Sequence, residues 1–181
     1  MSAQRCRAET RFAAANWLDD EDQMAKAELA TYLNDHLAGS VAALELLDHL
    51  IKQFKGQRLE KVFSDLRSDV RSDQNVLRDL IHRLDVEESS LRKAGAWLAE
   101  KLGRAKIGLA KEGAGLLQAL EALVLGITGK QLLWRAMAAV AEALPKLRGT
   151  DFGRLEERAI EQIERVEAER LQAARAALSA G

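Results

Sequence analysis

The apolar positions of the chain recur at spacings of three and four residues, which is the period of an amphipathic α-helix. We predict four long helices from this pattern, over residues 28–54, 59–84, 116–144 and 152–178. Strand-like alternation is nearly absent, so the pattern predicts an all-α fold. The apolar positions of the four helices, in chain order, are Leu33, Leu37, Leu44, Leu47 and Ile51; Leu59, Leu66, Val70, Leu77, Leu80 and Leu84; Leu120, Val124, Ile127, Trp134 and Met137; and Ala159, Ile160, Ile163, Val166 and Ala174.

The residues between the predicted helices indicate where each helix ends. Gly56 is placed to end the first helix, because glycine readily adopts the left-handed conformation of a C-terminal cap. Pro145 stops the third helix, because proline lacks a backbone N–H. Gly149, Thr150 and Asp151 then supply a turn and an N-cap for the fourth helix. Tight turns therefore join the first two helices and the last two, which makes the members of each pair antiparallel.

The second and third long helices are separated by a connection of about 30 residues. We predict a shorter helix within it, which begins near Ser89 or Ser90 and continues through Leu91, Leu98 and Leu102. One long crossover between two antiparallel pairs is the topology of a ferritin-like bundle. We therefore predict an all-α, ferritin-like four-helix bundle whose crossover carries an additional helix. A simple up-down bundle is the alternative, because a connection of this length can also pack without traversing the bundle.

The composition fits one globular domain. Hydrophobic residues make up 48% of the 181 residues and charged residues 30%, which is typical of a folded chain. Residues 1–23 carry arginines followed by an acidic run, so we predict a flexible N-terminal tail and a single helical-bundle domain over 24–181. Met24 stands just before the first strong helical pattern and is an alternative start of translation.

Charge and cysteine content narrow the class of protein. The formal net charge of -1 argues against a nucleic-acid binder, which is normally strongly basic. No stretch approaches 18 uncharged apolar residues, so we expect no transmembrane helix. Cys6 is the single cysteine and cannot form an internal disulfide, which fits a reducing compartment. We therefore expect a cytoplasmic protein.

Several stretches resemble an uncharacterised group of small bacterial helical proteins, and the similarity covers most of the chain after Met24. These stretches are residues 32–39, 45–46, 96–101, 120–121, 129–130, 133–135 and 158–178. This resemblance implies no activity. The arrangement of helices resembles the ferritin-like superfamily more distantly, through topology and not through a specific motif.

The di-metal members of that superfamily hold their ions with a carboxylate from each of two helices and a Glu-x-x-His pair from each of the other two. In ideal antiparallel helices, three carboxylates of this chain fall at one level and a fourth lies about one turn away. They are Glu45, Asp69 and Glu167, with Glu121 as the fourth. In the run 167–170, however, Arg170 stands at the histidine position, and Ser72 stands three residues after Asp69. We interpret these residues as a degenerate metal site.

An arginine at a former ligand position changes the chemistry. A guanidinium is permanently cationic and does not ligate metals, but it pairs with carboxylates. Asp73 lies on the apolar stripe of its helix, an unusual place for a charge, and Arg170 lies similarly on the fourth helix. We predict that Arg170 pairs with Asp69, Asp73 or Glu45. The predicted buried ion network is Asp69, Asp73, Glu167 and Arg170.

Two alternatives stay open for these charges. They can lie at the edge of the apolar stripes and reach water. They can also retain a metal site, with iron or manganese as the ion. The residues of that site would be Glu45, Asp69, Glu121 and Glu167.

The remaining candidate residues favour a non-enzymatic role. His82 points nearly opposite its apolar stripe, His49 lies well off its own, and His36 lies near the boundary. No histidine follows residue 82, so no histidine cluster of the zinc-enzyme type exists. Cys6 has no positioned histidine partner, and the chain has no phosphate-binding or dinucleotide-binding fingerprint. We expect no cofactor.

The crossover contains a basic helix with a tryptophan on one flank. A basic amphipathic helix of this type docks on anionic membranes or on acidic partners. The residues of this candidate docking surface are Lys93, Trp97, Lys101 and Arg104. The simpler interpretation is that the leucines of this helix cover the bundle while the charges face water.

The sequence thus favours a non-catalytic bundle with a structural or partner-binding role, and long bundles of this kind are compatible with a homodimer. A metal-binding protein of iron handling or oxidative-stress defence is the first alternative. A peripheral membrane or partner adaptor that works through the crossover is the second.

Overall fold

The computed structural model describes residues 3–86 and 114–179, with side chains from residue 23 onward in the first of these ranges. The regular structure of the described residues is entirely helical, so the prediction of an all-α fold is confirmed. The helix predicted within the crossover lies outside the described residues. The elements are α1 (Ala3–Gln53), α2 (Arg58–Arg83), α4 (Ala114–Val140), the short 3-10 helix η1 (Pro145–Leu147) and α5 (Phe152–Leu178).

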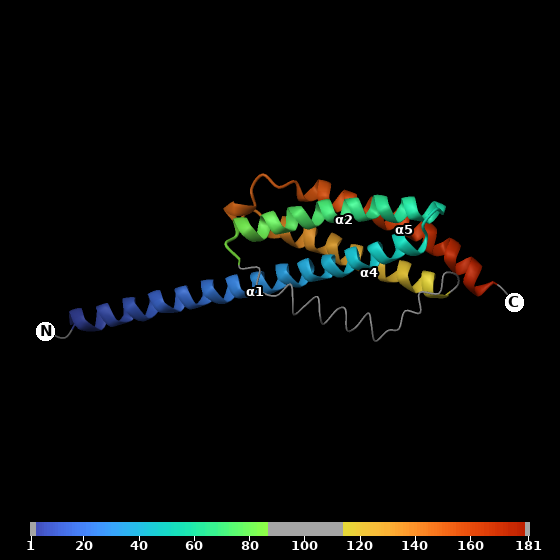
Figure 1. Ribbon diagram of the computed structural model, residues 1–181. Coiled ribbons are helices and arrows are strands. Elements are labelled where there is room, and N and C mark those ends of the chain that lie inside the picture. Colours follow the sequence, from blue (N-terminus) through green and yellow to red (C-terminus); the bar gives the residue numbers. More distant parts are fainter. Residues whose placement is uncertain (1–2, 87–113, 180–181) are drawn as a thin grey trace.

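The four long helices lie side by side as a bundle (Figure 1). Helices α1 and α5 run in one direction, and α2 and α4 run in the opposite one (Figure 1). Each helix is therefore antiparallel to the partner to which a short turn joins it. Helix α2 ends and α4 begins at opposite ends of the bundle (Figure 1).

Helix α1 begins at Ala3 rather than near residue 28, so the boundary that we placed at residue 23 is not a helix boundary. The first 20 or so residues are rich in alanine and arginine and contain no proline or glycine, so local propensity favours helix there. This part of α1 projects beyond the other helices (Figure 1). Without neighbouring helices it shows no strong apolar stripe, which is why periodicity did not reveal it.

The core consists of the predicted apolar stripes with few exceptions. Leu33, Leu47, Leu80 and Trp134 are at most 1% exposed. Ile160 differs from the prediction, since it is 40% exposed while its neighbour Ala159 is fully buried. Successive residues of a helix are separated by about 100°, and at this point of α5 Ala159 faces the core whereas Ile160 does not.

The helix ends follow the turn and capping residues of the sequence. Gly56 and Gly149 have φ angles of 79° and 82°, in the left-handed region that glycine tolerates. The Asp151 side chain accepts a hydrogen bond of 2.9 Å from the backbone N–H of Arg154, and so caps α5. Helix α4 ends at Val140, a few residues before Pro145.

Helix α4 is long and apolar enough to cross a membrane by the criteria of length and composition alone. A third of the residues in its most apolar stretch, 33%, are buried inside the bundle. In this structure α4 supplies Leu120, Ile127, Leu133 and Trp134 to the core of the bundle.

Replacement of the capping residue of α5 should destabilise the bundle. Asp151→Ala leaves the N–H of Arg154 without its side-chain acceptor, and we expect a loss of about 1 kcal/mol in the free energy of unfolding. Asp151→Asn keeps an acceptor at the same position and is the matched control. Urea denaturation of both variants measures the difference, and equal stabilities would contradict the capping role.

Candidate functional site

A cluster of polar side chains, which we call the Asp73 cluster, lies within the bundle and consists of Asp73, Lys130, Arg158 and Gln162. Asp73 is 2% exposed and Gln162 is fully buried. The Oδ2 atom of Asp73 accepts hydrogen bonds from Lys130 Nζ at 2.5 Å and from Gln162 Nε2 at 3.1 Å. Its Oδ1 atom accepts a hydrogen bond from Arg158, and Lys130 also donates to Oε1 of Gln162. One carboxylate thus receives three donors from two other helices.

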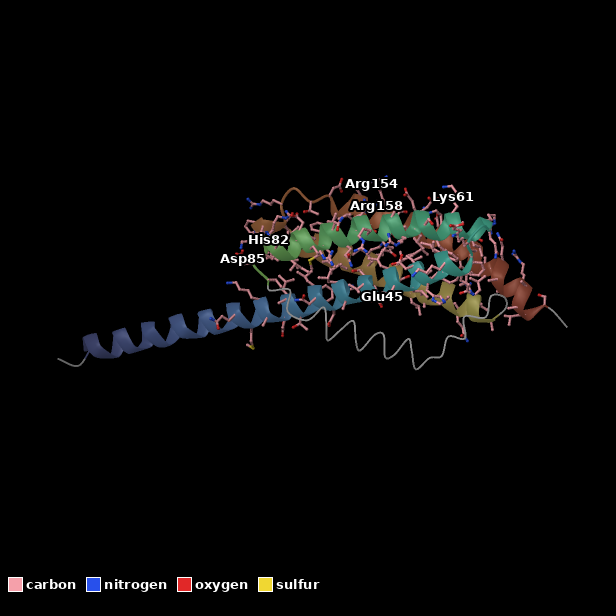
Figure 2. The ribbon with its side chains drawn as sticks, viewed as in Figure 1. Glu45, Lys61, His82, Asp85, Arg154 and Arg158 are labelled. Carbon is pink, nitrogen blue, oxygen red and sulfur yellow. The ribbon has the colours of Figure 1, made fainter. Side chains whose placement is uncertain are left out.

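Helical spacing explains why these residues meet. Asp73 lies on α2 between the buried residues Val70 and Leu77, so it shares their inward face. Arg158 and Gln162 are four residues apart and therefore lie one above the other on α5. Figure 2 shows Arg158 where α5 meets α2.

The balance of charge in the Asp73 cluster depends on Lys130. Asp73 contributes one negative charge, whereas Lys130 and Arg158 contribute two positive charges when both are protonated. Burial lowers the pKa of Lys130 to about 7, with the charge of Asp69 acting to raise it and that of Arg165 to lower it further. The cluster therefore changes between a net positive and a neutral state near pH 7.

A second chain of hydrogen bonds joins α1 to α2 beside the Asp73 cluster. Gln74 is 1% exposed, and its amide donates to the hydroxyl oxygen of Ser40 at 2.8 Å. Its Oε1 accepts a hydrogen bond of 2.8 Å from Arg71, and Ser40 donates to the carbonyl oxygen of Leu37 at 2.6 Å. These bonds satisfy the polar atoms of a buried amide, which would otherwise be costly to bury.

A cavity of about 220 Å³ adjoins the Asp73 cluster between α1, α2 and α4. Asp73 and Lys130 belong to its wall, so the cluster and the cavity share two charged residues. The described residues that line it are Asp35, His36, Gly39, Ser40 and Ala43 of α1; Val70, Asp73, Gln74 and Leu77 of α2; and Leu123, Gly126, Ile127, Gly129, Lys130, Leu133 and Trp134 of α4.

The four carboxylates that we predicted as metal ligands do not form one group in the structure, although Arg170 lies beside two of them, Glu167 and Glu121. Glu45 is exposed on α1 (Figure 2), and Asp69 pairs with Arg165. Glu167 accepts hydrogen bonds of 2.6 and 2.7 Å from Arg170, whose guanidinium lies 3.6 Å from Glu121. Among the residues that the structure describes, no three histidine, cysteine or acidic side chains form a group that could hold a metal ion.

The predicted ion network differs from the observed one in its arginine. Arg158 pairs with the buried Asp73, whereas Arg170 pairs with Glu167 and Glu121 and with none of its three predicted partners. Helix α5 is antiparallel to α2, and Asp69 already meets Arg165, so Arg170 lies past the level of Asp69. The hydrogen bonds from Arg170 lower the pKa of the Glu167 carboxyl, as a cationic neighbour does.

The other candidate residues lie outside the Asp73 cluster. His49 and His82 are exposed, as their distance from the apolar stripes predicts. His36 is half-buried, its ring centroid lies 4.7 Å from that of Tyr32, and burial lowers its pKa. The side chain of Cys6 lies outside the described part of the chain. So do the predicted docking residues Lys93, Trp97, Lys101 and Arg104.

Sequence reasoning missed Lys130, Arg158, Gln162 and Gln74. The signal for Lys130 was present, because it stands between Ile127 and Trp134 on the apolar face of a helix with few charges. Gln162 likewise stands between the buried Ala159 and Val166. A polar residue that interrupts a core stripe indicates a buried partner.

Comparisons of the chain with known protein families, with curated proteins and with solved structures found no match. The function is therefore inferred from the described residues alone.

Two aspartates one turn apart on α2 allow a matched test of the Asp73 cluster. Asp73→Ala leaves Lys130 and Arg158 without their buried carboxylate, and we expect a loss of about 3–5 kcal/mol in unfolding free energy. Asp69→Ala breaks the more exposed pair with Arg165 and should cost at most about 1 kcal/mol. Chemical denaturation measures both, and equal losses would contradict the importance of the buried carboxylate.

Lys130 should also make stability depend on pH, with a sign that follows from its lowered pKa. The folded protein releases this proton near pH 7, whereas the unfolded chain keeps it up to the ordinary value of 10.5. Between these values the unfolded state binds more protons, so the contribution of Lys130 to stability rises with pH. In this pH range we expect the unfolding free energy of the native protein to rise relative to that of Lys130→Met, by up to about 1.4 kcal/mol per pH unit. Parallel pH profiles of unfolding free energy would refute this assignment.

Proposed function

We propose that this protein is a non-catalytic bundle of ferritin-like connectivity, in which the cations of the Asp73 cluster replace a metal centre. The observation that carries the proposal is the Asp73 carboxylate, which is buried and receives hydrogen bonds from Lys130, Arg158 and Gln162. A buried carboxylate requires a compensating charge, and here side chains of the same protein supply it.

The directions of the helices support ferritin-like connectivity. In that topology two antiparallel pairs are joined by one long crossover. Here α1 and α2 form one antiparallel pair, α4 and α5 form the other, and the connection begins and ends at opposite ends of the bundle (Figure 1).

The arginines beside the predicted metal ligands argue for a structural role of these carboxylates. Arg165 lies against Asp69, and Arg170 lies against Glu167 and Glu121. A dication that approached these carboxylates would meet two permanent positive charges, and arginine does not release its proton to become a ligand. We therefore propose a scaffold or partner-binding role in the cytoplasm, without a resident metal.

Elemental mass spectrometry of tag-free protein, exposed to iron, manganese and zinc and then desalted, tests this proposal. We expect no stoichiometric metal and the same melting temperature with and without a chelator, because protein side chains already neutralise the buried charge.

Glu167→Gln and Glu45→Gln serve as the matched variants in this experiment. Near-stoichiometric iron or manganese that both variants lose would overturn the proposal in favour of a metal-binding protein. Metal that the two variants retain would indicate binding elsewhere on the chain and would also overturn a metal-free role.

A further inference from the structure

Three glycines border the cavity between α1, α2 and α4, and two of them, Gly39 and Gly126, are exposed. Gly39, Gly126 and Gly129 line it, and a Cβ atom built on any of them meets no described atom within 4 Å. Glycine in a helix often allows a close approach of another backbone, but no described atom approaches the position that a Cβ would take at these three glycines. Each one weakens its helix relative to alanine. Their common feature is the open space that they leave.

The size and the wall of the cavity fit a ring-sized apolar group. A cavity of about 150 Å³ lined by aliphatic and aromatic side chains binds benzene, and the one here is about 220 Å³. The surplus of volume accommodates a small polar substituent on such a ring. Leu77, Leu123, Ile127 and Leu133 supply apolar wall to the cavity.

Two donors in the wall define where the polar substituent would lie. Trp134 is 1% exposed, and its indole N–H has no hydrogen-bond acceptor among the described residues. A buried donor without an acceptor is costly, so a ligand that supplies one gains affinity. Lys130 has three N–H donors as an ammonium, and its described bonds to Asp73 and Gln162 use two.

The charge of the Asp73 cluster, of which Asp73 and Lys130 line the cavity, selects the sign of the ligand. Asp73 already receives three protein donors, so it offers little to a cationic ligand. Asp35 is exposed and lies on the same helix as the half-buried His36. The protonated Asp73 cluster has two cations for one carboxylate, and a ligand with one negative charge would balance it.

We propose that this cavity binds a small aromatic monocarboxylate, with its ring among the leucines and its carboxylate at Lys130 and Trp134. The inference goes beyond the proposed function, because a metal-free bundle does not require a ligand. It also survives if that proposal fails, since none of the four predicted metal ligands lines the cavity.

Binding of such an anion should be linked to uptake of a proton. Burial and Arg165 lower the pKa of Lys130, whereas Asp69 raises it, and Arg158 adds a further positive charge against Asp73. On the α1 side, the pKa of His36 is lowered by burial and raised by Asp35. A bound carboxylate stabilises both protonated forms, so affinity should be highest below about pH 7 and should fall as the pH rises above it.

Titration calorimetry of the full chain with benzoate tests the proposal. With nine non-hydrogen atoms, benzoate has a ligand-efficiency range that permits a low-millimolar or tighter dissociation constant. We expect benzoate to bind at pH 6 and to bind more weakly at pH 8, with net proton uptake in buffers of different ionisation enthalpy. Benzyl alcohol, which keeps the ring and loses the charge, should bind at least about tenfold more weakly.

Three variants locate the binding. Gly129→Leu fills the cavity on a helix that gains propensity, so it should stay folded and lose benzoate binding. Gln118→Leu adds the same side chain at an exposed position of α4 and should bind as the native protein does. Trp134→Phe removes a donor that has no described partner, and should weaken benzoate binding by about tenfold. The smaller ring also leaves buried space, so we expect a lower melting temperature for this variant.

The proposal is overturned by any of three results. These are no heat and no thermal stabilisation by millimolar benzoate, equal binding of benzoate and benzyl alcohol, or undiminished binding by folded Gly129→Leu. Circular dichroism of each variant establishes that it is folded before it is titrated.

Discussion

The buried carboxylate of Asp73 is the constraint on which the arrangement of three helices depends. A charge at 2% exposure is tolerated only if donors surround it, and here the donors come from α4 and α5. Apolar stripes alone permit helices to slide by a turn with little change in buried area. The hydrogen bonds to Lys130, Arg158 and Gln162 specify one register of α2 against its neighbours. We infer that the cluster contributes to the specificity of packing.

The parts of the fold that depend on local chemistry could be predicted from the sequence. The bounds of α5 agree with the prediction, because Asp151 caps the helix through its own backbone neighbour and Gly149 permits the preceding turn. The start of α1 could not be predicted in this way. Its first residues lie beyond the other helices, so no core imposes an apolar stripe on them, and Ala3 rather than residue 28 begins the helix.

The candidate site was predictable only in part, because its contacts depend on how helices align. Asp73 interrupts an apolar stripe, and that pattern alone indicates a buried charge. The arginine that pairs with Asp73 could not be predicted from such a pattern, because Arg158 and Arg170 both lie at the border of the apolar face of α5. Their roles are separated by the register of α5 along α2, because the twelve residues between them correspond to about three helical turns.

The cavity and the Asp73 cluster are best understood together. A bundle that needed only stability would fill this space, since alanine at Gly126 or Gly129 would strengthen α4 and meet no described neighbour. Such a bundle would also avoid a buried lysine, because burial lowers the pKa of Lys130 to about 7. Because Lys130 belongs to both features, an anion in the cavity would favour the protonated form of this lysine and so change the charge of the Asp73 cluster. Occupancy of the cavity and packing of α2, α4 and α5 are thus coupled through one side chain.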